Sequence, residues 1–195
     1  MEKQIKSKSR VSDFGEVFTA RKQVCDMVGL VDREVRNITT TVLEPACGNG
    51  NFLTEILARK LESVVAVSGD HLETEWLVLK AVSSIYGVDI QQDNTVECRD
   101  RLFKQVMKRF RDGSVLFAKT LRTILEKNII CGDTLTMTDE KSAPLTIPEW
   151  EIRENGTAVR KDVLFSDMIA NGGISTNYIR RYYYRWMPEE KRLTA

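Results

Sequence analysis

The sequence predicts an α/β fold in which a mostly parallel sheet is flanked by helices. Short β-branched segments, such as residues 38–43 and 85–90, are separated by longer segments whose apolar residues recur at helical spacing. With 195 residues, the chain is long enough for one domain with a real core and too short for two comfortable ones. We therefore expect a single domain at residues 11–195, preceded by a basic tail at residues 1–10.

The composition is that of a globular protein, with 42% apolar and 29% charged residues. No apolar run approaches the ~20 residues that span a bilayer, and the N-terminus lacks the apolar core of a signal peptide. We expect a cytoplasmic protein with no membrane partner. The four cysteines are widely scattered, so we expect reduced thiols and no metal site. The net charge of +1 argues against a strongly basic nucleic-acid-binding protein but leaves room for a local basic face.

The central stretch is residues 43–53, Leu-Glu-Pro-Ala-Cys-Gly-Asn-Gly-Asn-Phe-Leu, which has the pattern of a strand end, a glycine turn and a helix start. Gly48 and Gly50 permit a tight turn and a close approach of backbone to ligand. The free N–H groups at the following helix start are suited to an anionic or hydrogen-bonding ligand. Without other motifs, an ordinary strand-to-helix loop explains a single Gly-x-Gly turn equally well.

Before the central stretch, residues 15–20 read Gly-Glu-Val-Phe-Thr-Ala and precede a helical pattern. On its residues alone, this segment is a packing arm in which Thr19 caps the helix. The basic tail ahead of it, with Lys3, Lys6, Lys8 and Arg10, is expected to be solvated.

Two acids are candidates for binding the hydroxyls of a ribose. Asp70 follows the β-branched residues 64–67, about 20 residues beyond the glycine turn, which is the usual spacing in dinucleotide-binding folds. Asp89 closes residues 85–90, which have the stronger strand pattern. We favour Asp89 and interpret Asp70 as a loop or cap residue.

The second half of the chain contains two amphipathic helical patterns, at residues 94–111 and 115–125. The first has a basic face, which is either solvated or a DNA contact. A short strand pattern then ends at Asp133. Residues 134–161 are polar and contain an Asn-Gly turn signal, which predicts a loop or short hairpin. A fourth strand pattern follows at residues 163–165.

The tail at residues 178–186 interleaves arginines with aromatic residues. This pattern is compatible with a surface that stacks bases and binds phosphates. We favour a helix that buries its aromatic side chains against the sheet.

Taken in series, four of these stretches resemble the S-adenosylmethionine-dependent N6-adenine DNA methyltransferases of restriction–modification systems. Residues 15–20 resemble the family's Gly-Glu-Phe/Val-Phe/Tyr-Thr-Pro element, with Ala20 in place of proline, and residues 43–53 resemble its cofactor loop. Residues 85–90 resemble its second motif, and residues 128–133 match Asn-Ile-x-x-Gly-Asp. The similarity extends over about residues 10 to 175.

The resemblance implies a Rossmann-like methyltransferase fold and S-adenosylmethionine as cofactor. In the family, the Phe and Thr lie beside the methionine part of the cofactor. The acid of the second motif accepts hydrogen bonds from the ribose hydroxyls, and the later Asp accepts one from the adenine amino group. The cofactor-binding residues implied here are Phe18, Thr19, Glu44, Ala46, Gly48, Gly50, Asp89, Ile90 and Asp133.

The catalytic motif of the family, Asp-x-Ile/Val-x-x-Asn-Pro-Pro-Tyr/Phe, is degenerate in this chain. Asp167, Ile169 and Asn171 fit its frame, whereas residues 172–174 are Gly-Gly-Ile instead of Pro-Pro-aromatic. The resemblance therefore implies Asn171 as the catalytic residue and impaired or absent catalysis. Two functions follow: an N6-adenine methyltransferase of double-stranded DNA, or its cofactor-binding portion, and alternatively an inactive structural or regulatory subunit.

The family fold usually has seven strands in the order 3-2-1-4-5-7-6, and this sequence supplies about the first four. We therefore expect an incomplete fold, without its C-terminal strands. Strand four would lie at an exposed edge, which proteins avoid or cover. A partner chain, a second copy of this chain or the aromatic tail is expected to cover that edge.

Overall fold

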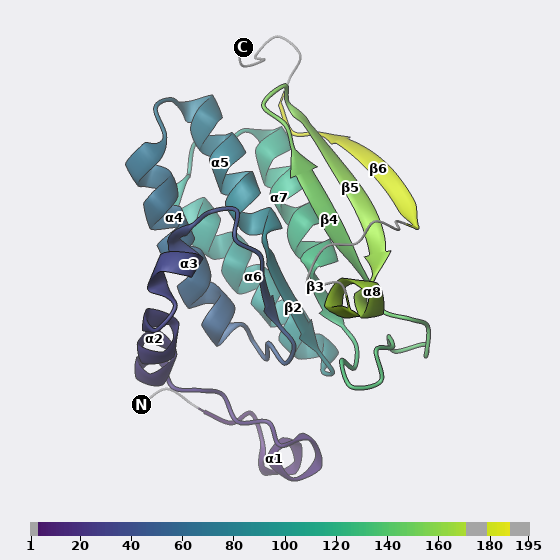
Figure 1. The fold of residues 1–195 in the computed structure, drawn as a ribbon. Coiled ribbons are helices and arrows are strands. Elements are labelled where there is room, and N and C mark those ends of the chain that lie inside the picture. The colour runs from purple at the N-terminus through teal and green to yellow at the C-terminus, as the bar shows by residue number, and fades with distance from the viewer. Residues whose placement is uncertain (1–3, 171–178, 188–195) are drawn as a thin grey trace.

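The computed structural model describes residues 4–170 and 179–187 (Figure 1). The helices are α1 (Lys8–Phe14), α2 (Arg21–Gly29), α3 (Asp32–Arg36), α4 (Asn51–Val67), α5 (His71–Ser83), α6 (Gln92–Arg109), α7 (Val115–Asn128) and α8 (Phe165–Ala170). The strands are β1 (Val42–Glu44), β2 (Ile85–Asp89), β3 (Ile129–Cys131), β4 (Thr146–Ile152), β5 (Thr157–Leu164) and β6 (Arg180–Arg185). Within these ranges, no helix combines the length and apolar character needed to cross a membrane.

The first sheet is parallel, in the order β1-β2-β3, with β2 in the middle. A pair of helices connects each strand to the next, α4 and α5 after β1, and α6 and α7 after β2. One face of the sheet, including Val42, Ile85 and Ile129, packs in the same apolar core as these helices. The expected α/β class is confirmed.

The second face of the parallel sheet is covered mainly by strands, together with the short helix α8. Its residues Leu43, Tyr86, Val88 and Ile130 pack in a separate core with Leu145, Ile147, Val163, Phe165 and Met168. These partners come from β4, β5, α8 and the loop before β4. In Figure 1, β4, β5 and β6 (green to yellow) lie on the opposite side of the parallel strands from α4 and α6. The expectation of helices on both faces is therefore wrong for this face.

β4, β5 and β6 form an antiparallel sheet with β5 in the centre. The hairpin expected at the Asn-Gly turn is confirmed and is longer than expected, because β4 and β5 pair over their full lengths around Gly156, whose φ is +82°. The expected fourth parallel strand is wrong: residues 163–164 are the end of β5. Residues 163–164 pair with β4, and β6, which belongs to the aromatic tail, pairs with residues 157–162 of β5, so the tail covers most of the second edge of this strand, which was one of the expected alternatives.

Three local expectations also need correction. Residues 64–67 are the last turn of α4 and not a strand, because Val64 continues the buried stripe of that helix. Residues 180–185 form β6 and not a helix, because they pair with β5 and place Tyr184 against Trp150, with 5.6 Å between ring centroids. The first strand is shorter than expected and begins at Val42.

Lys60 joins α4 to the loop that leads into β1. Its side chain is fully buried, and its Nζ donates hydrogen bonds to the carbonyls of Asn37, Ile38 and Thr40 at 2.8, 3.3 and 2.8 Å. Burial lowers the pKa of Lys60 to about 8. The three carbonyl acceptors act in the opposite direction, because they stabilise the ammonium.

We expect Lys60→Met to lower the free energy of unfolding by about 2–4 kcal/mol, because it leaves buried carbonyls without a donor. Burial of Lys60 lowers its folded pKa to about 8 from 10.5, so the unfolded chain binds more protons between these values. The stability of the parent relative to the variant should therefore rise with pH over that interval. Urea unfolding across the interval measures both effects.

The matched control is Lys119→Met, on the exposed side of α7. It should change stability by less than about 0.5 kcal/mol and without a pH trend. Equal stability of the Lys60→Met variant and the parent at every pH would contradict this account of Lys60.

Candidate functional site

A cavity of about 620 Å³ lies where the three parallel strands end. This volume is within the range of small-molecule sites, about 300–1,000 Å³, and the carboxyl edge of a parallel sheet is where such sites form. Four segments line the cavity: residues 14–19 before α2, the glycine turn after β1, the turn after β2, and residues 132–135 after β3.

Most of the residues implied by the resemblance line this one cavity. They are Phe18, Thr19, Glu44, Ala46, Gly48, Asp89, Ile90 and Asp133. Gly50 is not among the lining residues. Asp70 lies elsewhere and caps α5, where its Oδ1 accepts a hydrogen bond from the Glu73 N–H at 2.8 Å. Asn171, with residues 172–174, lies outside the described residues.

The two glycines of the turn are required for different reasons. Gly48 has φ +52°, and a Cβ there would lie 3.2 Å from the Phe18 ring. Gly50 has φ +89°, and a Cβ there would lie 2.5 Å from Cys98 Sγ on α6. Gly48 therefore lets the arm before α2 approach the turn, and Gly50 lets α6 pack beneath it.

Asp89 connects the glycine turn to the end of β2 by hydrogen bonds. Its Oδ2 accepts a hydrogen bond from the Gly48 N–H at 2.8 Å. Its Oδ1 accepts from the Gln91 N–H at 2.8 Å and from Asn94 Nδ2 at 3.1 Å. Since the two oxygens of a carboxylate offer about four acceptor positions, Asp89 retains capacity for a ligand hydroxyl while it orders the turn.

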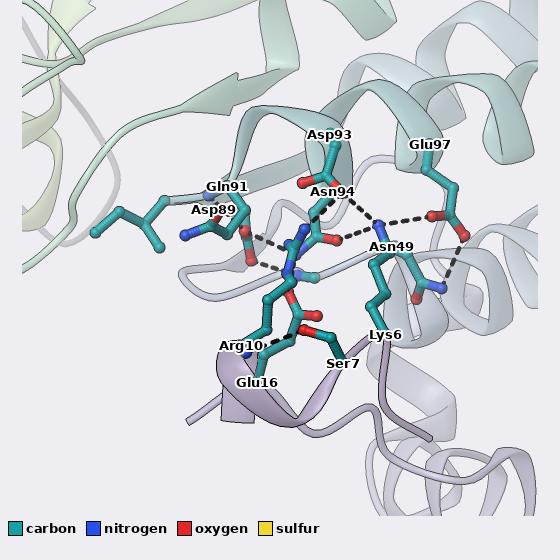
Figure 2. A network of polar contacts seen from close by, with 12 residues as sticks. Lys6, Ser7, Arg10, Glu16, Asn49, Asp89, Gln91, Asp93, Asn94 and Glu97 are labelled. Carbon is teal, nitrogen blue, oxygen red and sulfur yellow. Dashed lines mark hydrogen bonds and ion pairs between the residues drawn. The ribbon is translucent and has the colours of Figure 1, made fainter. Parts of the chain in front are cut away.

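Residues 4–19 are here called the N-terminal arm, and residues 14–19 of this arm line the cavity. Figure 2 shows the polar contacts between the arm and α6. Lys6 Nζ lies 2.9 Å from Asp93 and 3.0 Å from Glu97, and Arg10 lies 2.7 Å from Asp93. Arg10 and Lys6 together hold the pKa of Asp93 well below its usual range. The expectation of a solvated basic tail is therefore wrong for Lys6 and Arg10, because acids of α6 and the arm itself pair with them.

The arm is also attached to α4, because Asn51 Nδ2 donates a hydrogen bond to the Thr19 carbonyl at 2.9 Å. Within the arm, the Phe18 N–H donates to the Gln4 carbonyl at 2.7 Å. Thr19 does not cap α2 as expected, because Ala20 occupies the N-cap position and Thr19 faces the cavity.

The cavity lining is acidic. It includes Glu16, Glu44, Asp89 and Asp133, and none of the lining residues in the described part of the chain is Lys, Arg or His. Burial raises the pKa of Glu44. A lining of this kind favours a cationic ligand or one that donates hydrogen bonds, and it disfavours a phosphate-rich ligand, whose charge would be unpaired.

Two residues of the site were not identified from the sequence. Glu16 lies within the Gly-Glu-Val-Phe-Thr-Ala segment, which was a usable signal, but only the Phe and Thr were assigned a role. Asn94, on α6, donates hydrogen bonds to both Glu16 and Asp89. Nothing in its sequence neighbourhood marks it, because its importance comes from the approach of the arm to α6.

The comparisons with known proteins give no family for this chain. No protein-family model, no curated protein and no solved structure matches it significantly. A functional proposal therefore depends on the geometry of the cavity and on the motifs that line it.

We expect Gly50→Ala to lower the free energy of unfolding by at least about 2 kcal/mol, because it combines a left-handed backbone with a clash against Cys98. Adding Cys98→Ala should recover part of the loss, since it removes the clashing sulfur but not the backbone cost. Gly29→Ala is the control, because a Cβ at Gly29 meets nothing within 4 Å. Urea unfolding measures all four proteins, and equal stability of Gly50→Ala and Gly29→Ala would disprove the packing role of Gly50.

Proposed function

We propose that the cavity binds S-adenosylmethionine and that the chain is a methyltransferase-like domain. The observation that carries this proposal is convergence. Four stretches, chosen from the sequence alone and distributed between residues 15 and 133, contribute to the lining of one cavity. Three of these stretches end parallel strands and share one edge of the sheet by topology, so the approach of residues 15–19 to the same edge is the independent part of this observation.

The lining also fits the chemistry of this cofactor. S-adenosylmethionine carries a sulfonium, an ammonium, two ribose hydroxyls and an adenine amino group, and it has no phosphate. The acids and the apolar residues of the cavity suit these groups better than the phosphates of a dinucleotide. By the resemblance, Phe18 and Thr19 would contact the methionine part, Asp89 the ribose, and Asp133 the adenine amino group.

The parallel sheet supports the same proposal. The order β1-β2-β3, with two helical crossovers packed on one face, is the arrangement of the first three strands in a Rossmann-like methyltransferase fold. The antiparallel sheet takes the place that further helices would have on the second face. We therefore propose a Rossmann-like cofactor-binding half with a divergent second half.

The proposed reaction is methyl transfer to the N6 amino group of adenine in double-stranded DNA. S-adenosylmethionine, when bound, supplies a methyl group on a good leaving group, so the residues of the chain have mainly to align an extrahelical adenine with it. Asn171 is the proposed residue that would hold the amino group. The Gly-Gly-Ile sequence at residues 172–174 favours a second candidate, an inactive cofactor-binding subunit that acts through a partner chain.

Ile90 gives the sharpest test of cofactor binding. Its side chain lines the cavity and is 55% exposed, so its removal should not disturb the core. Ile90→Ser should weaken the binding of S-adenosylmethionine about 10- to 100-fold, the loss expected for one buried apolar side chain. Isothermal titration calorimetry measures the change.

Val96→Ser is the matched control, because Val96 is similarly exposed, at 53%, and lies on α6 outside the cavity lining. It should leave the affinity unchanged. No binding of S-adenosylmethionine by the folded parent would refute the proposal. If the parent binds, incubation with methyl-labelled S-adenosylmethionine and duplex DNA separates the two candidates: labelled N6-methyladenine identifies the enzyme, and unlabelled DNA favours the inactive subunit.

A further inference from the structure

Glu16 has an unusual hydrogen-bonding state for a buried carboxylate. Its side chain is only 8% exposed. Oε2 accepts hydrogen bonds from the Arg10 guanidinium and, at 2.8 Å, from Asn94 Nδ2. Oε1 is buried and has no hydrogen-bond partner among residues 4–170 and 179–187. Glu16 is among the residues that line the cavity, so this acceptor without a donor belongs to a residue of the candidate site.

This state is energetically unfavourable without a ligand. A buried acceptor without a donor is costly, more so when the group is charged. The Arg10 guanidinium donates hydrogen bonds to Oε2, and Arg10 is itself paired with Asp93. The arm therefore holds a carboxylate with one oxygen fully paired and the other available, which is the arrangement of a site preorganised for a hydrogen-bond donor.

The contacts of Asn94 indicate which group of a ligand would donate a hydrogen bond to Glu16 Oε1. The two hydrogens of its Nδ2 are donated to Glu16 Oε2, at 2.8 Å, and to Asp89 Oδ1, at 3.1 Å. Its Oδ1 accepts a hydrogen bond from Lys6 Nζ at 2.7 Å, which fixes the orientation of the amide. Figure 2 shows Glu16, Asn94 and Asp89 as neighbours in one network. Glu16 and Asp89 are thus held side by side as two acceptors.

Two adjacent carboxylates, each with spare acceptor capacity, match a vicinal diol, which presents two adjacent O–H donors. We propose that Glu16 is a ligand-binding and specificity-determining residue: its Oε1 accepts a hydrogen bond from one ribose hydroxyl while Asp89 accepts from the other. This inference rests on the proposed function, since the ribose is that of S-adenosylmethionine. Arg10 and Asn94 are positioning residues, which orient Glu16 without contact to the ligand.

The test compares the binding of S-adenosylhomocysteine with that of its 2′-deoxy and 3′-deoxy analogues, by calorimetry, on the parent and on Glu16→Gln. The unaltered protein should bind at least one deoxy analogue about tenfold or more weakly than it binds S-adenosylhomocysteine. A loss of this size is expected when a hydrogen bond to a charged group is removed. Glu16→Gln should bind S-adenosylhomocysteine more weakly by a similar factor. For the deoxy analogue that the unaltered protein binds weakly, Glu16→Gln should lower the affinity little further, because that analogue already lacks the hydroxyl that Glu16 would bind.

Asp13→Asn is the control, because Asp13 is an exposed acid of α1, in the same arm, and does not line the cavity. It should retain the full preference for the ribose. Comparison of the three ligands on the unaltered parent keeps the test valid even if Glu16→Gln fails to fold.

Two results would overturn the inference. One is equal binding of all three ligands by the unaltered protein. The other is a Glu16→Gln variant that keeps the full preference for S-adenosylhomocysteine over its deoxy analogues. In either case Glu16 does not bind a ribose hydroxyl, and a water molecule is the simpler partner for Oε1. Either result leaves the proposed cofactor site intact. If the parent binds none of the three ligands and no S-adenosylmethionine, the proposed function fails and the inference fails with it.

Discussion

The arrangement of the site depends on the carboxylate of Asp89. Through one oxygen it binds the backbone of Gly48, and through the other it binds Gln91 and Asn94. It therefore joins the turn after β1, the end of β2 and the first turn of α6. Because Asp89 is only 9% exposed, these hydrogen bonds are protected from competition with water. Together with the backbone hydrogen bond from the Cys47 N–H to the Val88 carbonyl, the carboxylate holds the glycine turn at the end of β2.

The N-terminal arm depends on the same point of the structure. Asn94 is fixed by Asp89, and Glu16 and Lys6 are fixed by Asn94. Lys6 and Arg10 extend the network to the acids of α6. The basic residues of the arm thus form ion pairs with Asp93 and Glu97, which do not line the cavity, and the lining itself remains acidic. This separation of charge explains how a protein with a net charge of +1 presents an acidic cavity.

The lining of the cavity was more predictable from the sequence than the second half of the fold. The glycine turn and Asp89 belong to contiguous stretches, in which a strand is directly followed by a residue that lines the cavity, so the sequence alone indicated that they would lie together. The pairing partners of β5 were not predictable, since a short β-branched pattern does not specify which sheet it joins. Residues 180–185 are a run of arginines and tyrosines, in which neither the alternation of apolar and polar residues typical of a strand nor the apolar spacing of a helix is clear. The role of Asn94 arises only from the packing of distant segments.

The two-sheet architecture separates the cavity from the segment that resembles the family's catalytic motif. The loops after β1, β2 and β3 and residues 14–19 of the arm line the cavity, and these three strands pack with α4–α7 in one core. The segment that leads to the degenerate catalytic motif belongs to the second sheet: β5 runs antiparallel to β4 and continues into α8. Phe165 and Met168 of α8 pack with Tyr86 and Val88 of β2, so α8 lies on the second face of the parallel sheet. In the resembled family, the catalytic strand instead lies beside strand one, in the sheet that binds the cofactor. The chain differs from that family in its Gly-Gly-Ile sequence at residues 172–174 and, among the described residues, in the antiparallel pairing of β5. Both differences concern the part of the chain after the start of β4, whereas every residue that lines the cavity precedes β4.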